Sequence, residues 1–124
     1  MIKKYMSELK YDIKKVVEFL GGGIDETIVA SLIGIFVSSV NDEFPAFAEA
    51  VAADDRPAIH KIGHKLKGSS ANLGFESFRK LCEDLEQHAR NDLDFDYKAT
   101  FEKLGQEKQA IEEWFASVKA DYGL

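Results

Sequence analysis

The chain lacks several features that would assign it to common protein classes. Its 124 residues include one cysteine, Cys82, so an internal disulfide bond is excluded and a reducing, cytoplasmic setting is expected. No Asn-Gly or Asp-Gly pair marks a tight β-hairpin. The glycines at 21–23 are not followed by the Lys-Ser or Lys-Thr of a phosphate-binding loop, so we expect no ATP site and no autokinase activity.

A net basic charge and a long hydrophobic run are also missing. The net charge of −6 argues against a nucleic-acid partner, because phosphate backbones attract clustered positive charge. The longest weakly polar run, residues 28–40, is shorter than a helix that spans a bilayer. The N-terminal residues carry no apolar signal region. We therefore expect neither a nucleic acid nor a membrane as a partner.

What the chain does contain is apolar residues at helical spacing over its whole length. Glycines or acidic residues separate five such stretches, and these residues typically end or begin helices. In the second stretch Asp25 is the expected N-cap, and Pro45 is expected to kink a continuous helix. The expected helices cover about 2–20, 25–51, 55–74, 75–89 and 97–120. The apolar face predicted for the second consists of Ile28, Leu32, Ile35, Phe36, Val40, Phe44, Phe47 and Val51.

Helices joined by short connections tend to pack antiparallel. We therefore expect an all-α fold, in which the second to fifth helices form an antiparallel four-helix bundle. The additional N-terminal helix, about 2–20, would cover one end or side of the bundle. The length suits a single domain over 1–124, with its bundle core over about 25–120.

The segment from His60 to Gly74 is the most informative about function. Its apolar residues lie on one face of a helix, and His64 points roughly 170° away from the centre of that face. An exposed imidazole is a nucleophile near neutral pH, because its ordinary pKa is about 6.5. Lys67 lies three residues on, beside His64 on the helix surface, and can place a positive charge near a bound anion. The pattern suits a histidine that carries phosphate.

The motif His-Lys-Leu-Lys-Gly-Ser-Ser-x-x-Leu-Gly at 64–74 resembles the signature of histidine-containing phosphotransfer (HPt) domains. The long apolar helix before it, the acidic turn at 54–55 and the sequence Leu-Cys-x-x-Leu-Glu at 81–86 extend the resemblance over roughly 25–90. One departure is Gly63, because the family usually has alanine at this position. Glycine costs a helix up to about 1 kcal/mol relative to alanine, but we expect no effect on the chemistry.

The resemblance implies a monomeric, cytoplasmic phosphocarrier, rather than an enzyme, that relays phosphoryl groups between receiver-domain aspartates in a multistep two-component phosphorelay. Its partners would be response-regulator receiver domains and a hybrid sensor kinase. It implies no cofactor on this chain, with Mg²⁺ on the receiver domain. His64 would accept the phosphoryl group, Lys67 would stabilise its charge, and Gly68 would leave room for the incoming aspartate. Residues around His64 would contact the partner: Pro57, His60, Lys61, Lys65 and Ala71.

Two other functions fit parts of the pattern. The same bundle could be an HPt-like adaptor that docks a response regulator without carrying phosphate. Alternatively, it could bind a metal or haem, because His60 and His64 are four residues apart; no third ligand is evident, and no metal site is expected. The acidic residues Glu83, Asp84 and Glu86 are interpreted as a solvated helix face. Cys82, between two leucines, is interpreted as a buried packing residue.

Overall fold

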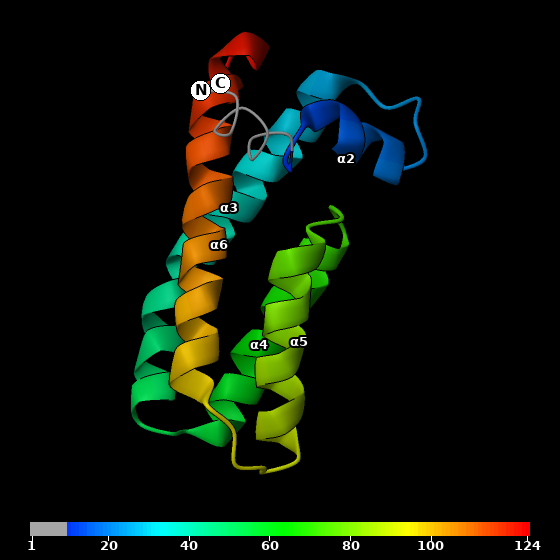
Figure 1. Cartoon of the computed structure of the whole chain (residues 1–124). Helices are drawn as coiled ribbons and strands as arrows, with labels where there is room; N and C mark the ends of the chain where they lie inside the picture. Colours follow the sequence, from blue (N-terminus) through cyan, green and yellow to red (C-terminus); the bar gives the residue numbers. More distant parts are fainter. Residues whose placement is uncertain (1–9) are drawn as a thin grey trace.

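The computed structural model describes residues 10–124, and over this range the chain forms α-helices and no strands. The helices are α2 (Ile13–Phe19), α3 (Glu26–Ala52), α4 (Arg56–Ala71), α5 (Glu76–Arg90) and α6 (Tyr97–Val118), followed by a 3-10 helix at Lys119–Tyr122. Helices α3 to α6 form an antiparallel bundle in which each packs against two neighbours (Figure 1). The all-α class, the four-helix bundle and the additional N-terminal helix are thereby confirmed.

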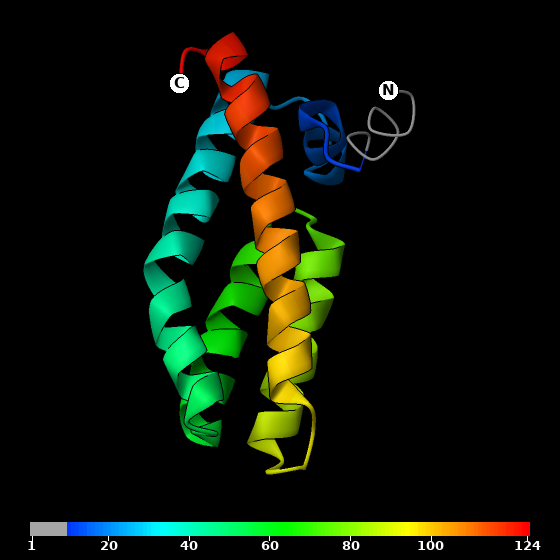
Figure 2. The same cartoon turned by 60° about the vertical axis from the view of Figure 1, so that its left-hand side comes forward.

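The bundle combines two long helices with a shorter hairpin. Helices α3 and α6 have 27 and 22 residues, whereas α4 and α5 have 16 and 15, so the long pair extends beyond the hairpin at one end (Figures 1 and 2). Helix α2 lies at this end, where Ile13 and Val16 are buried. The Tyr11 ring contacts Phe75 and Trp114 at centroid distances of 5.7 and 5.6 Å. This packing covers the core at the end of the bundle where α2 lies.

Aspartate side chains begin most of the helices, as the sequence indicates. Asp25 caps α3 and Asp55 caps α4 by accepting hydrogen bonds from backbone N–H groups in the first turn. Asp54, the residue before this cap, adopts a left-handed conformation with φ of 53° in the turn before α4. Pro57 lies in the first turn of α4, where no backbone donor is needed. Helix α3 continues through Pro45 without interruption, as expected.

The predicted extent of the N-terminal helix is wrong at residues 10–12, whereas residues 13–19 are helical as expected. Residues 2–9 of the predicted span, 2–20, lie outside the described residues. The chain from Lys10 to Asp12 is not helical, and α2 begins only at Ile13, where Asp12 accepts a hydrogen bond from the Lys14 N–H. Tyr11 leaves the helical path because its ring is used to pack against aromatic side chains of the bundle.

The apolar face predicted for α3 is wrong in its first half. Ile28, Leu32 and Ile35 are 53%, 39% and 65% exposed. The reason is that residues 27–41 contain no charged side chain, so the pattern does not show which side of the helix faces inward. The predicted residues that are buried lie further along the helix, at Phe36, Val40, Phe47 and Val51. Packing against α4 and α6 selects an inward face at Val29, Ala30, Ile33, Phe36 and Val40.

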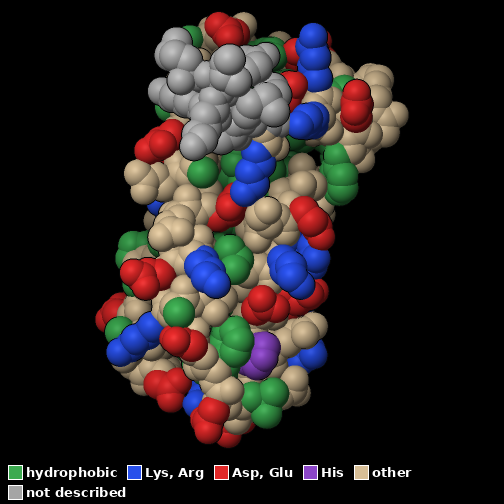
Figure 3. Space-filling view, in the orientation of Figure 1, with side chains coloured by type: hydrophobic (Ala, Val, Ile, Leu, Met, Phe, Trp, Pro, Cys, Tyr) green, Lys and Arg blue, Asp and Glu red, His purple; other side chains and the backbone are tan. Residues whose placement is uncertain are grey.

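The same apolar stretch makes α3 long and apolar enough to cross a membrane by length and composition alone. This is weak evidence for a membrane, because core helices of water-soluble proteins pass the same test. Elsewhere the surface is charged: on the face shown in Figure 3, acidic and basic side chains are interspersed over α5 and α6, without a broad basic area.

Candidate functional site

His64 lies near the middle of α4 on the side that faces solvent. The opposite side of this helix is buried through Ile59, Leu66 and Ser70, which fixes the orientation of α4 in the bundle. The His64 side chain is 68% exposed, in agreement with its predicted position. The hydroxyl of the buried Ser70 donates to the Leu66 carbonyl, so it packs within the helix and does not face the histidine.

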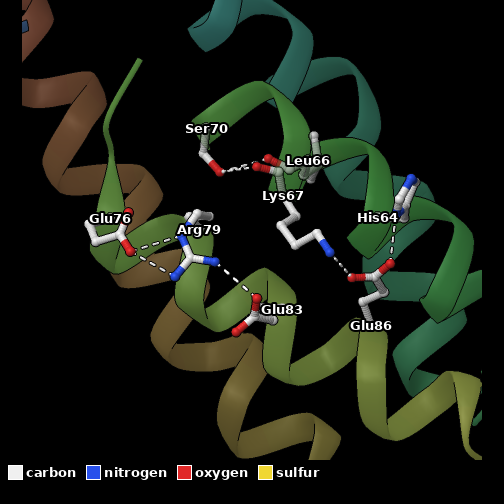
Figure 4. A network of polar contacts seen from close by, with 8 residues as sticks. All are labelled: His64, Leu66, Lys67, Ser70, Glu76, Arg79, Glu83 and Glu86. Carbon is white, nitrogen blue, oxygen red and sulfur yellow. Dashed lines mark hydrogen bonds and ion pairs between the residues drawn. The ribbon is translucent and has the colours of Figure 1, made fainter. Parts of the chain in front are cut away.

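A buried glutamate on α5 holds the His64 ring. The Glu86 side chain is only 1% exposed, and its Oε2 lies 2.6 Å from His64 Nδ1. Its other oxygen, Oε1, forms an ion pair with Lys67 Nζ at 2.6 Å. Figure 4 shows this carboxylate reaching from α5 to both side chains of α4. One acidic group therefore links the predicted phosphate acceptor and the predicted cationic helper.

The Glu86 carboxylate also determines which ring nitrogen carries the proton when His64 is neutral. Burial alone would raise the pKa of Glu86, but the ion pair with Lys67 and the hydrogen bond with His64 outweigh burial and hold this pKa below its usual value. An ionised carboxylate only accepts hydrogen bonds, so His64 Nδ1 carries the proton and donates it. The lone pair of the neutral ring is then on Nε2, on the side away from Glu86 (Figure 4).

Gly63 allows α5 to come close enough for this contact. A Cβ atom at Gly63 would lie 3.3 Å from the Cys82 carbonyl oxygen and 3.4 Å from Glu86. The 3.3 Å distance is shorter than most contacts of real Cβ atoms, so alanine would require the neighbouring carbonyl to shift by a few tenths of an ångström. The position at which the sequence departs from the family pattern therefore packs directly against the residue that holds His64.

The interpretation of Glu86 as part of a solvated face is wrong, and its role escaped the sequence analysis. A signal is present: the buried residues of α5 include Phe78, Cys82, Leu85 and Ala89, and Glu86 falls within this stripe, four residues after Cys82. A carboxylate inside an apolar stripe needs a partner, because a buried charge without one is costly. Only the position of α4 relative to α5 identifies that partner as His64.

The other predicted site residues lie on α4 at different distances from this centre. Gly68 is exposed, and a Cβ placed on it would meet nothing within 4 Å, so the surface beyond His64 is open there. Lys65 pairs with Glu43 of α3 at 2.5 Å and is therefore turned away from Glu86. Pro57 and Lys61 are exposed, and Ala71 is half-buried.

His60 lies one turn before His64, and the two ring centroids are 6.2 Å apart. Its Nδ1 is 4.0 Å from the same oxygen of Glu86 that binds His64. Within residues 10–124, no three His, Cys, Asp or Glu side chains are grouped so that they could hold a metal ion. Cys82 is fully buried and burial raises the pKa of its thiol, which agrees with a packing residue.

Comparison with known proteins identifies a family over most of the chain. The sequence model of the Hpt domain matches residues 31–119, which extend from the first half of α3 through α6 and include His64, Lys67 and Glu86. No curated protein and no solved structure matched the chain. Because this match covers more than half of the residues, the chain belongs to the Hpt domain family, a histidine phosphotransfer family of two-component signalling whose members are phosphocarriers rather than enzymes.

Proposed function

We propose that this chain accepts a phosphoryl group on His64 from the aspartyl phosphate of a receiver domain and passes it to the aspartate of another. The observation that carries the proposal is the exposed His64 ring whose Nδ1 is bound to the buried Glu86 carboxylate. This contact leaves the nucleophilic Nε2 facing solvent, where a partner domain can reach it.

The transfer needs little covalent machinery from this chain. The Nε2 lone pair attacks the phosphorus of the aspartyl phosphate, the N–P bond forms, and the O–P bond breaks to leave a free carboxylate on the receiver. The ring keeps its Nδ1 proton and becomes positively charged. Glu86, already within 2.6 Å of that nitrogen, stabilises the charge that develops on the ring. The reverse sequence of steps passes the group on.

Lys67 would stabilise the charge of the transferred group. Its Nζ is held near the histidine by Glu86 and its side chain is 26% exposed, so a modest movement brings the ammonium to the phosphoryl oxygens. Gly68 would leave room for the partner domain to approach His64, because a Cβ atom at this position would meet nothing within 4 Å. The exposed residues Pro57 and Lys61, together with His60, Lys65 and Ala71, would form the part of the docking surface that α4 contributes.

The partners proposed here follow from the family. They are response-regulator receiver domains, which would supply the Mg²⁺, and a hybrid sensor kinase upstream. We propose that the chain works as a cytoplasmic phosphocarrier and needs no cofactor of its own. An adaptor that docks a receiver without carrying phosphate remains the second candidate, and the intact His64–Glu86–Lys67 arrangement favours the phosphocarrier over it.

The decisive experiment is phosphoryl transfer from receiver domains charged with acetyl phosphate. Wild type should acquire an acid-labile, alkali-stable label, and His64→Gln should acquire none, although a glutamine amide can still donate to Glu86 and preserve the fold. His88→Gln replaces an imidazole that bonds a backbone carbonyl within α5 and should be labelled like wild type. Gly68→Gln should fold normally and accept phosphate on the order of tenfold more slowly, because its side chain obstructs the partner.

Two results would contradict the proposal. Label that persists in His64→Gln would assign the phosphate to another residue. Receiver domains that bind the wild-type chain without transferring any phosphate to it would favour the adaptor.

A further inference from the structure

His60 has a buried ring nitrogen without a hydrogen-bond partner. Its Nδ1 is inaccessible to solvent and makes no hydrogen bond, although the side chain as a whole is 36% exposed. The nearest acidic atom is Oε2 of Glu86, at 4.0 Å. A buried polar atom that is left unpaired is costly, so its presence beside the reacting histidine calls for a physical explanation.

The balance of charge around His64 provides a physical explanation for this unpaired nitrogen. In the form of the chain that can react, the negative charge of Glu86 is matched by Lys67. The His64 ring is then neutral, because only a neutral ring has the Nε2 lone pair that attacks phosphorus. After transfer, the phosphoryl oxygens carry about two negative charges and the His64 ring one positive charge. The group is therefore left with about one unmatched negative charge, close to the buried carboxylate. One further proton on a neighbouring base would restore the balance.

We propose that His60 takes up this proton and acts as the charge-balancing residue of phosphorylated His64, an inference that rests on the proposed function of His64. The charged or titratable groups in contact with the His60 side chain among the described residues are Glu86 from α5 and His64 from α4, with Lys67 bound to the far oxygen of Glu86. A protonated His60 donates from Nδ1 toward Glu86 Oε2, which becomes the acceptor that this nitrogen lacks.

The proposal has a consequence for the direction of transfer. If phosphorylation of His64 favours a proton on His60, then by linkage a proton on His60 favours phosphorylation of His64 by the same factor. Mild acidification would therefore move the phosphoryl group from receiver domains onto this chain, and alkaline conditions would release it.

The direct test is an NMR titration of the histidine rings in the full chain. The protein is examined unmodified and after phosphorylation by phosphoramidate, which labels histidine without a partner protein. We expect the titration midpoint of His60 to rise by one pH unit or more on phosphorylation, which is a tenfold gain in proton affinity. His88, stacked on Phe95 at 3.8 Å, is the internal control and should move much less. A His60 midpoint that moves no more than that of His88 overturns the proposal.

A functional test uses the pH dependence of the transfer equilibrium with one receiver domain. As the pH is lowered from 8.5 to 6, the transfer equilibrium of wild type should shift toward the phosphorylated chain. This shift should be about tenfold larger than the shift for His60→Gln. The receiver's own titrations cancel in this comparison. His60→Lys, whose side chain is charged throughout this pH range, should favour the phosphorylated chain equally at all pH values. Parallel pH profiles for wild type and His60→Gln would overturn the proposal, whereas failure of phosphoramidate to label His64 would overturn the proposed function itself.

Discussion

Two groups of acidic and basic side chains include residues of α5 but lie in different surroundings (Figure 4). Arg79 binds Glu76 and Glu83 at 2.7 and 3.0 Å, all within one helix and at the spacings of three and four residues that any helix brings together. Glu86 is buried and binds His64 and Lys67, which belong to another helix. Similar distances therefore accompany very different degrees of burial.

Distance alone therefore does not identify a functional ion pair. The side chains of Arg79 and its two partners are 23% to 69% exposed, so water competes for each and such pairs contribute little to stability. The carboxylate of Glu86 has lost its water and depends on its two partners. Those partners are themselves partly exposed, so Glu86 controls groups that a partner protein can still reach.

Removing the buried carboxylate should slow transfer strongly, whereas removing an exposed one should not. Glu86→Leu deletes the acceptor for His64 Nδ1, and phosphoryl transfer should slow on the order of tenfold to a hundredfold, as for other carboxylates that orient a functional histidine. Glu83→Leu, one turn away, should transfer like wild type. Quenched transfer assays on both variants measure the two transfer rates. Equal rates would show that the buried and the exposed group do not differ in their effect on transfer.

An intermediate effect is expected in acid. The pKa of Glu86 is held below its usual value in the folded chain, so an unfolded chain binds a proton at Glu86 more readily. The stabilisation is complete well above pH 4.5 and is lost as the pH falls through the folded pKa, by about 1.4 kcal/mol for each pH unit of lowering. Urea unfolding between pH 3 and 7 should therefore show a steeper loss for wild type than for Glu86→Gln. Identical slopes would mean that Glu86 gains no net stabilisation from its partners.

The smallest effect is expected for Gly63→Ala, which tests how closely α5 must approach. Alanine favours the helix by up to about 1 kcal/mol, but its Cβ meets Cys82 and Glu86 at 3.3 to 3.4 Å. The two effects oppose each other, so the free energy of unfolding should change by less than about 1 kcal/mol while transfer slows by a few-fold. Thermal unfolding and transfer rates measured together check this. Unchanged transfer would show that the position of Glu86 tolerates the extra methyl group.

Sequence patterns predict much of the bundle, and the predictions that are wrong have clear physical causes. Helix α4 is predicted well because its apolar residues occupy one face and Asp55 and Pro57 mark its start. Helix α3 is long but apolar on several sides, so the inward face predicted for it is wrong around Ile35. At the N-terminus, Lys10 to Asp12 leave the helix because Tyr11 packs against the bundle, which no local pattern shows.

Sequence alone determined the class of fold, the exposed direction of His64 and the family to which its motif points, because helical periodicity and short motifs are local properties. The family assignment was then confirmed by the match over residues 31–119. That Glu86 and His60 share the space beside His64 follows only from the packing of α5 against α4. Glu86 comes from a helix 22 residues further along the chain, and the close approach at Gly63 places its carboxylate against the ring. Burial then turns an ordinary glutamate into the group that fixes which nitrogen of a neutral His64 ring carries the proton, because a charge without water must be satisfied by its neighbours.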